Sequence, residues 1–125
     1  MKNEQFLSAQ CHMTRSMAIL GTKWKPIIIY GIADKTIRFG QLAAHMPLIS
    51  RKVLTEQLKE LEADGILLRE SFSEIPPRVE YHLTEKGLAL LPILEDMCAW
   101  NQKYGTGEVI CSKKGGAKKK AAQLA

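Results

Sequence analysis

The sequence predicts an α+β fold that is mainly helical, with short helices first, then a two-stranded hairpin, then a long final helix. Three observations carry this prediction. Apolar residues recur at helical spacing between Ser50 and Gly65, two β-prone segments flank the prolines Pro76 and Pro77, and helical spacing returns after Thr84. At 125 residues the chain has room for one domain with its own core.

Two short helices are expected near the start of the chain. One runs from Thr14 to Leu20, and the other covers about 23–33, with Pro26 early, where its missing N–H costs little. Their apolar content indicates that both contribute to the core. In the second helix the residues expected to be buried are Trp24, Ile27, Ile28 and Tyr30.

A third short helix over 39–45 leads through a tight connection into a longer helix. Ser50 is a typical N-cap for that longer helix, and Gly65 is a typical stop, because glycine readily adopts the left-handed conformation found after helix ends. Leucines at i, i+4 and i+7 form one buried stripe: Leu54, Leu58 and Leu61. Two helices joined by a short turn are typical of a helix-turn-helix.

Two strands follow, over 66–72 and 78–83. Pro76 and Pro77 lie between them and hold the backbone extended, so they stiffen the tip of a hairpin. A hairpin directly after a helix-turn-helix indicates a β-wing.

A last helix is expected from a Thr84 N-cap to about Tyr104, with a local kink at Pro92. Its apolar residues cover more than one face, which a single domain of this size cannot bury. A second copy of the chain is therefore the expected cover. The residues predicted at this dimer interface are Leu91, Leu94, Met97 and Trp100.

The net charge of +5 arises from the end of the chain. Of 18 lysines and arginines, five lie after Ser112: Lys113, Lys114, Lys118, Lys119 and Lys120. Without these five, 13 basic residues face 13 acidic ones, so residues 1–112 are formally neutral. An argument for nucleic-acid binding has to rest on where the charges lie, not on their sum.

The helix after Ser50 carries its charges against its own dipole. Helices favour acidic residues in the first turn, yet Arg51 and Lys52 come first and the acidic residues come last. An anion at the amino end removes this cost, and the free N–H groups there already favour phosphate. We therefore predict that this helix reads the major groove of DNA. The predicted contact residues are Ser50, Arg51, Lys52, Thr55, Glu56 and Lys59. The alternative is a solvated surface helix with an arbitrary order of charges.

The run from Cys11 to Tyr104 resembles the HxlR-type winged helix-turn-helix regulators of bacteria, relatives of the MarR group. The resemblance rests on the segments GTKWKPIII, RFGQL, ISRKVLTEQLKELEADGIL, PPRVEYHLTEKG and MCAWNQKYG, with Thr22 where the family pattern has a second glycine. It implies a dimeric transcription factor with dimerisation helices at both ends and a pseudo-palindromic operator.

The resemblance also implies that the wing reaches the DNA backbone or the minor groove. Arg78, just after the prolines, is the predicted wing contact. The alternative for Arg78 is a salt bridge to Glu74 or Glu80, and the sequence does not decide between the two.

The three cysteines, Cys11, Cys98 and Cys111, are odd in number and widely spaced, which indicates neither a disulfide framework nor a zinc ribbon. Cys11 lies beside His12 and close to a helix amino end, where a thiolate is stabilised. The resemblance places it where some members of the family sense oxidants or electrophiles. Cys11 is thus either a redox sensor or an unreactive cysteine kept for packing, and Cys98 is expected in the core.

Other function classes find less support. A metal- or small-molecule-responsive regulator of the same fold would need a dimer to assemble Cys11, His12 and either Cys98 or His82 as ligands. No chelating spacing accompanies them, so no metal and no cofactor is predicted. No enzyme is predicted, because no catalytic group of nucleophile, base and orienting residue can be placed in a cleft. A winged-helix protein used only for protein contacts would show no salt-dependent affinity for DNA.

The sequence therefore predicts an N-terminal extension over 1–10, one winged helix-turn-helix domain over 11–104, and a basic, flexible tail over 105–125. The polar start and the short apolar runs predict a cytoplasmic protein without a membrane segment. The predicted partners are double-stranded DNA and a second copy of the chain, and the effector stays unknown.

Overall fold

The computed structural model describes residues 10–105. The chain divides into two compact units, Met1–Leu88 and Ala89–Ala125. The described part of the second unit holds one helix, α7 (Leu91–Tyr104). The elements of the first unit are α2 (His12–Leu20), α3 (Lys25–Ile32), β1 (Ile37–Arg38), α4 (Phe39–His45), α5 (Arg51–Ala63), β2 (Leu67–Phe72), β3 (Arg78–Leu83) and α6 (Glu85–Leu88). The single domain expected over 11–104 stays a prediction.

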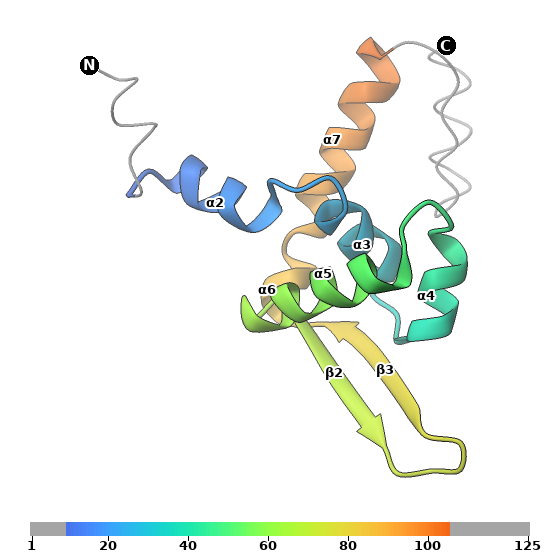
Figure 1. The fold of residues 1–125 in the computed structure, drawn as a ribbon. Helices are drawn as coiled ribbons and strands as arrows, with labels where there is room; N and C mark the ends of the chain where they lie inside the picture. The colour runs from blue at the N-terminus through green and yellow to red at the C-terminus, as the bar shows by residue number, and fades with distance from the viewer. Residues whose placement is uncertain (1–9, 106–125) are drawn as a thin grey trace. The chain divides into compact units, whose positions relative to one another are not determined.

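The strands form one antiparallel sheet in the order β1-β3-β2. β2 and β3 pair from Leu67 opposite Leu83 to Phe72 opposite Arg78, and β1 adds a short edge with Ile37 opposite Tyr81. Figure 1 shows β2 and β3 as a hairpin whose turn lies away from α3 and α5. The prediction of a mainly helical α+β fold with a β-wing is confirmed.

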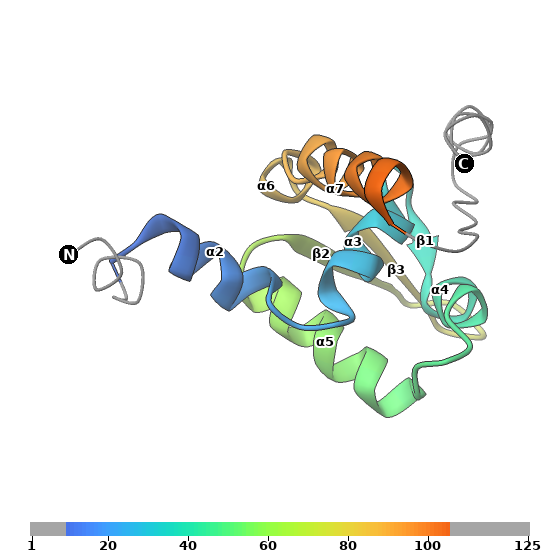
Figure 2. The same ribbon diagram turned by 90° about the horizontal axis from the view of Figure 1, so that it is seen from above.

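The core of the first unit lies where α3 packs against α4 and α5 and where all three helices pack against the sheet (Figure 2). Its fully buried side chains are aliphatic: Ile28, Ile29, Ile32, Leu42, Leu54, Leu58, Leu61, Ile66 and Leu67. The predicted leucine stripe of α5 is therefore confirmed, and it determines which face of that helix points outward.

Local signals set the bounds of α4 and α5. α4 covers the seven residues predicted for it. The Ser50 hydroxyl accepts a hydrogen bond from the Val53 N–H at 3.1 Å, which is the N-cap that the sequence predicts. Gly65 has a φ of +76°, in the left-handed region that favours glycine after a helix end.

The two early helices differ from expectation. α2 begins at His12, two residues before the predicted start, because the Cys11 carbonyl already accepts the first helical hydrogen bond from Arg15. No residue of α2 is buried, so its placement in the core is wrong for the single chain. In α3 the buried residues are Lys25, Ile28, Ile29 and Ile32, while Ile27 is exposed and Trp24 and Tyr30 are half-buried.

The long last helix is interrupted. α6 ends at Leu88 and α7 begins at Leu91, with Pro92 in the first turn of α7. Proline has no N–H to continue the ladder of hydrogen bonds, so the expected kink is a break. Thr84 does cap the helix that follows it, since its hydroxyl accepts a hydrogen bond from the Gly87 N–H at 3.2 Å. Within residues 10–105 no helix is long and apolar enough to span a bilayer.

Candidate nucleic-acid interface

The amino end of α5 presents two cations to solvent. Arg51 and Lys52 are exposed, and within residues 10–105 neither forms an ion pair. The Arg51 guanidinium lies 5.6 Å from the centroid of the Phe39 ring, a contact that leaves its N–H donors available. The first turn of α5 contains no acidic residue, so the dipole and both side chains favour an anion here.

The remaining predicted contacts of α5 lie along its outer side and flank. Glu56 and Lys59 are exposed, as expected for residues opposite the leucine stripe. Thr55 is half-buried, and its hydroxyl donates a hydrogen bond to the Arg51 carbonyl at 2.8 Å. The hydroxyl oxygen of Thr55 can still accept a hydrogen bond. The contact with a base that is expected of Thr55 stays a prediction.

The acidic carboxyl half of α5 has an internal role that the sequence did not reveal. The Glu60 carboxylate lies 2.6 Å from the Nζ of Lys25, whose side chain is only 5% exposed, while that of Glu60 is 56% exposed. The Thr22 hydroxyl donates to Gln57 Oε1 at 3.0 Å one turn earlier. The first residue of α3 and the segment before it thus hold one flank of α5, and part of the reversed charge order serves packing.

A signal for Lys25 was present in the sequence. It opens an almost entirely apolar helix, where a lysine is buried only with an anionic partner. Its partner lies 35 residues away, so periodicity alone does not identify it.

Arg78 is engaged within the protein. Its Nη2 lies 3.1 Å from Glu74, its Nε lies 3.4 Å from Glu80 without hydrogen-bond geometry, and its guanidinium lies 4.1 Å from the centroid of the Phe72 ring. These contacts favour the salt-bridge alternative that the sequence left open. A DNA contact through Arg78 stays a prediction.

Strand alternation separates the two faces of the hairpin. Leu67, Leu83 and Tyr81 are buried on the face that contacts α5, and Arg69 lies directly opposite Tyr81, on the same face. The other face carries Phe72 opposite Arg78, as well as Glu70 opposite Glu80. Arg69 was not among the predicted site residues, although counting by two from Leu67 places it on the face toward α5.

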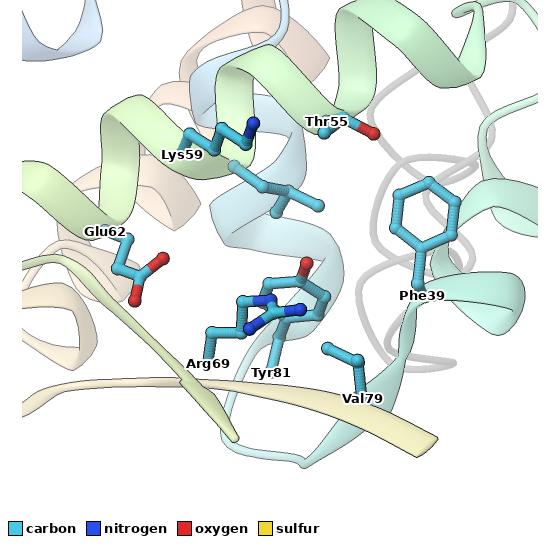
Figure 3. A pocket seen from close by; sticks show the side chains of 8 residues that line it. Phe39, Thr55, Lys59, Glu62, Arg69, Val79 and Tyr81 are labelled. Atoms are coloured by element: carbon cyan, nitrogen blue, oxygen red, sulfur yellow. The ribbon is translucent and has the colours of Figure 1, made fainter. Parts of the chain in front are cut away.

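A cavity of about 520 Å³ lies between this face of the hairpin and α5. Figure 3 shows its lining, with Thr55, Lys59 and Glu62 from α5 on one side and Arg69, Val79 and Tyr81 from the sheet on the other. Leu58 and Phe39 complete it. The cavity combines an apolar lining with charged residues at its rim.

Cys11 is the N-cap residue of α2 and is half-buried. The backbone N–H of Thr14, close to the sulfur, lowers the pKa of the Cys11 thiol; the Met13 N–H and the Thr14 hydroxyl act in the same direction, and partial burial opposes them. Cys98 in α7 is half-buried, and neither cysteine is in a disulfide. Cys111 lies outside the described residues. Among residues 10–105 no group of three or more His, Cys, Asp and Glu side chains is arranged to hold a metal ion.

α7 has an exposed apolar stripe, with residues at i, i+4, i+7 and i+11: Ile93, Met97, Trp100 and Tyr104. Met97 and Trp100 of the predicted interface set are 57% and 64% exposed. Leu91 is half-buried, and Leu94 is only 4% exposed in the single chain. The structure thus adds Ile93 and Tyr104 to the exposed face, and Leu94 does not lie on it.

Comparison with known proteins gives a consistent family. The model of the family described as HxlR-like helix-turn-helix matches residues 19–108. An HTH-type transcriptional regulator from Halalkalibacterium halodurans is 48% identical over 89 residues, covering 70% of this chain and 79% of that protein.

Two solved structures show the same fold. One, described as a MarR-family transcriptional regulator from Porphyromonas gingivalis, has a TM-score of 0.75 and 36% identity, and covers 78% of this chain and 95% of the other. The other is the redox regulator HypR in its oxidised form, with a TM-score of 0.71 and 40% identity, covering 79% of this chain and 100% of that one.

Proposed function

The chain belongs to the HxlR-like helix-turn-helix family, and on this premise we propose that it regulates transcription by binding a pseudo-palindromic operator as a homodimer. The observation that carries the proposal is the amino end of α5, where Arg51 and Lys52 are exposed and without ion pairs within residues 10–105. In this arrangement α5 enters the major groove, and Ser50, Arg51 and Lys52 contact phosphate while Thr55, Glu56 and Lys59 approach base edges.

Selection of bound duplexes from a random pool, with and without an oxidant, tests the proposal. We expect the reduced protein to enrich two inverted half-sites whose centres are about 10 base pairs or a multiple apart, because a two-fold dimer presents two copies of α5. Failure to enrich any sequence, together with affinity that does not fall with salt, would refute it.

The second copy is expected to cover the exposed stripe of α7. Changing Met97 to Glu should convert the dimer into monomer, because burial of one methionine contributes about 1.5 to 3 kcal/mol and a two-fold interface contains it twice. Sedimentation equilibrium measures the change. Ala99, exposed on the same helix but off the stripe, supplies the matched control Ala99→Glu. A Met97→Glu protein that dimerises as tightly as the control would place the interface elsewhere.

We further propose that Cys11 senses oxidants or electrophiles. Two observations support this: the neighbouring N–H groups of the first turn of α2 lower the pKa of the Cys11 thiol, and the redox regulator HypR shares the fold. A lowered pKa keeps the reactive thiolate populated at pH values where an ordinary thiol is protonated, and the thiolate is lost only as pH falls through the lowered pKa.

The Cys11→Ser variant should bind the operator like the reduced wild type but should not be released by diamide or benzoquinone. Cys98→Ser is the matched control and should still be released. The measurement is operator affinity before and after treatment, combined with mass spectrometry of the modified cysteine. Alkylation of Cys11 at pH 7 should also outpace that of Cys98. Normal release of the Cys11→Ser variant would assign the response to another residue.

A further inference from the structure

The cavity between α5 and the hairpin has one basic side chain on each side. Lys59 contributes from α5 and Arg69 from β2, and both are exposed (Figure 3). Within the described residues neither forms an ion pair. Glu62 is the one acidic residue in the lining, so the lining carries a formal charge of +1 from two cations and one anion.

Arg69 is oriented within this cavity by the sheet. It lies opposite Tyr81 in the register of β2 and β3, and its Nη1 donates a hydrogen bond to the Ser71 hydroxyl at 3.0 Å. A guanidinium carries five N–H donors, so this bond orients the group and leaves donors for an anion. The remaining lining is apolar, mainly Leu58, Val79, Tyr81 and Phe39.

On the opposite face of the sheet the arginines lie beside carboxylates. There Arg78 pairs with Glu74 and Glu80, and Arg38 lies 3.9 Å from the same Glu80. His82 lies 3.8 Å from Glu70, a pair that is ionic only when the histidine is protonated. Within the part of the chain that the structure describes, the arginines on the face away from α5 thus lie beside carboxylates, whereas Arg69 on the face toward α5 forms no ion pair.

We propose that the cavity between α5 and the hairpin receives a backbone phosphodiester of DNA, held between Lys59 and Arg69. Charge complementarity selects a phosphate, and the apolar lining suits the adjoining deoxyribose. The exposed rim admits a continuous strand from the side. Arg69 then carries a salt-dependent contact of the wing. This inference rests on the proposed function, because it assigns a phosphate contact within the same DNA complex, and it gives Lys59 this phosphate in place of a base edge.

Salt dependence of operator affinity tests the assignment. Each phosphate contact adds about 0.9 to the slope of log affinity against log salt concentration. We expect the site to need both cations to hold the phosphate. Arg69→Gln and Lys59→Gln should therefore each lower the slope by about one, and the double variant should lower it by no more than about one, because only one phosphate contact is lost. Lys35→Gln removes an exposed cation in the turn after α3, outside the proposed contacts, and it should leave the slope unchanged.

Replacement of single phosphates by methylphosphonate locates the contact. At one position per half-site, the methylphosphonate should lower the affinity of the wild type. The same replacement should not lower the affinity of Arg69→Gln, because that variant has already lost the contact. Arg69→Lys should restore the slope, which a variant that merely disturbs the fold would not do. Thermal unfolding establishes that each variant is folded.

The possible failures are distinct. If Arg69→Gln keeps the wild-type slope while Arg51→Ala lowers operator affinity, the phosphate assignment is wrong, but the proposed regulatory function is not contradicted. If the double variant lowers the slope by about two, the two cations serve separate phosphates and the shared site is refuted. If the wild type shows no salt-dependent binding to any duplex, both proposals fall.

Discussion

Replacing Arg51 or Lys52 with alanine is expected to weaken operator binding by about 1 to 3 kcal/mol each, with the larger loss in the double variant. Both residues lie in the first turn of α5, where the backbone N–H groups and the positive end of the helix dipole already attract an anion. Removing the cations removes the phosphate contacts that determine how the helix enters the groove.

The same substitutions should not lower the stability of the free protein. A cation near a helix amino end costs about 0.3 to 1 kcal/mol, so its removal is neutral or slightly stabilising. The expected signature is therefore a fall in DNA affinity together with an unchanged or higher midpoint of urea unfolding.

Fluorescence anisotropy with a labelled operator and urea unfolding monitored by circular dichroism measure the two quantities. Lys35→Ala is the matched control, because Lys35 is an exposed cation in the turn after α3. If the Arg51 and Lys52 variants bind the operator as tightly as the control, α5 does not enter the groove. A large loss of stability would show that the two cations have structural partners.

Replacing Glu60 with alanine is expected to destabilise the fold by about 1 to 3 kcal/mol, because it leaves the ammonium of Lys25 buried without its carboxylate. Lys25 is 4% exposed, and its Nζ lies 2.6 Å from Glu60. The cost stays below that of a fully enclosed pair, since Glu60 is 56% exposed and water can reach the site.

The Lys25→Met variant should cost less than Glu60→Ala. Methionine retains most of the apolar stem of lysine and leaves no buried charge, while the exposed Glu60 carboxylate returns to water. Glu56→Ala, an exposed change of the same type on the same helix, is the control and should stay within about 0.5 kcal/mol of wild type.

Chemical denaturation of the four proteins gives the comparison, and the double variant Lys25→Met/Glu60→Ala closes the thermodynamic cycle. We expect the double variant to be about as stable as Lys25→Met alone, because the second change then leaves no charge unpaired. Equal losses for Glu60→Ala and Glu56→Ala would mean that water compensates Lys25 and that the pair does not hold α5.

The flanks of α5 connect these predictions. On one flank Lys25 and Thr22 bind Glu60 and Gln57, and on the other lies the cavity lined by Lys59 and Arg69. A change that loosens the first flank is expected to alter how α5 lies against the hairpin. Glu60→Ala should then lower discrimination between operator and random duplex, as well as stability.

The sequence by itself determined the elements whose signals are local. The bounds of α4, the Ser50 cap, the Gly65 stop and the leucine stripe of α5 follow from hydrogen bonding, backbone conformation and helical period within a few residues. The family also follows from the sequence, because the motifs occur in order along one chain.

Tertiary structure alone decided the features that depend on distant partners. Which side of α3 is buried, the pairing of Lys25 with Glu60, and the commitment of Arg78 to Glu74 and Glu80 are set by packing and charge across the fold. The position of the Arg69 side chain in the cavity also depends on strand register, which places it opposite Tyr81. A residue's type fixes which interactions it can make, but the neighbours brought by folding decide which of them it makes.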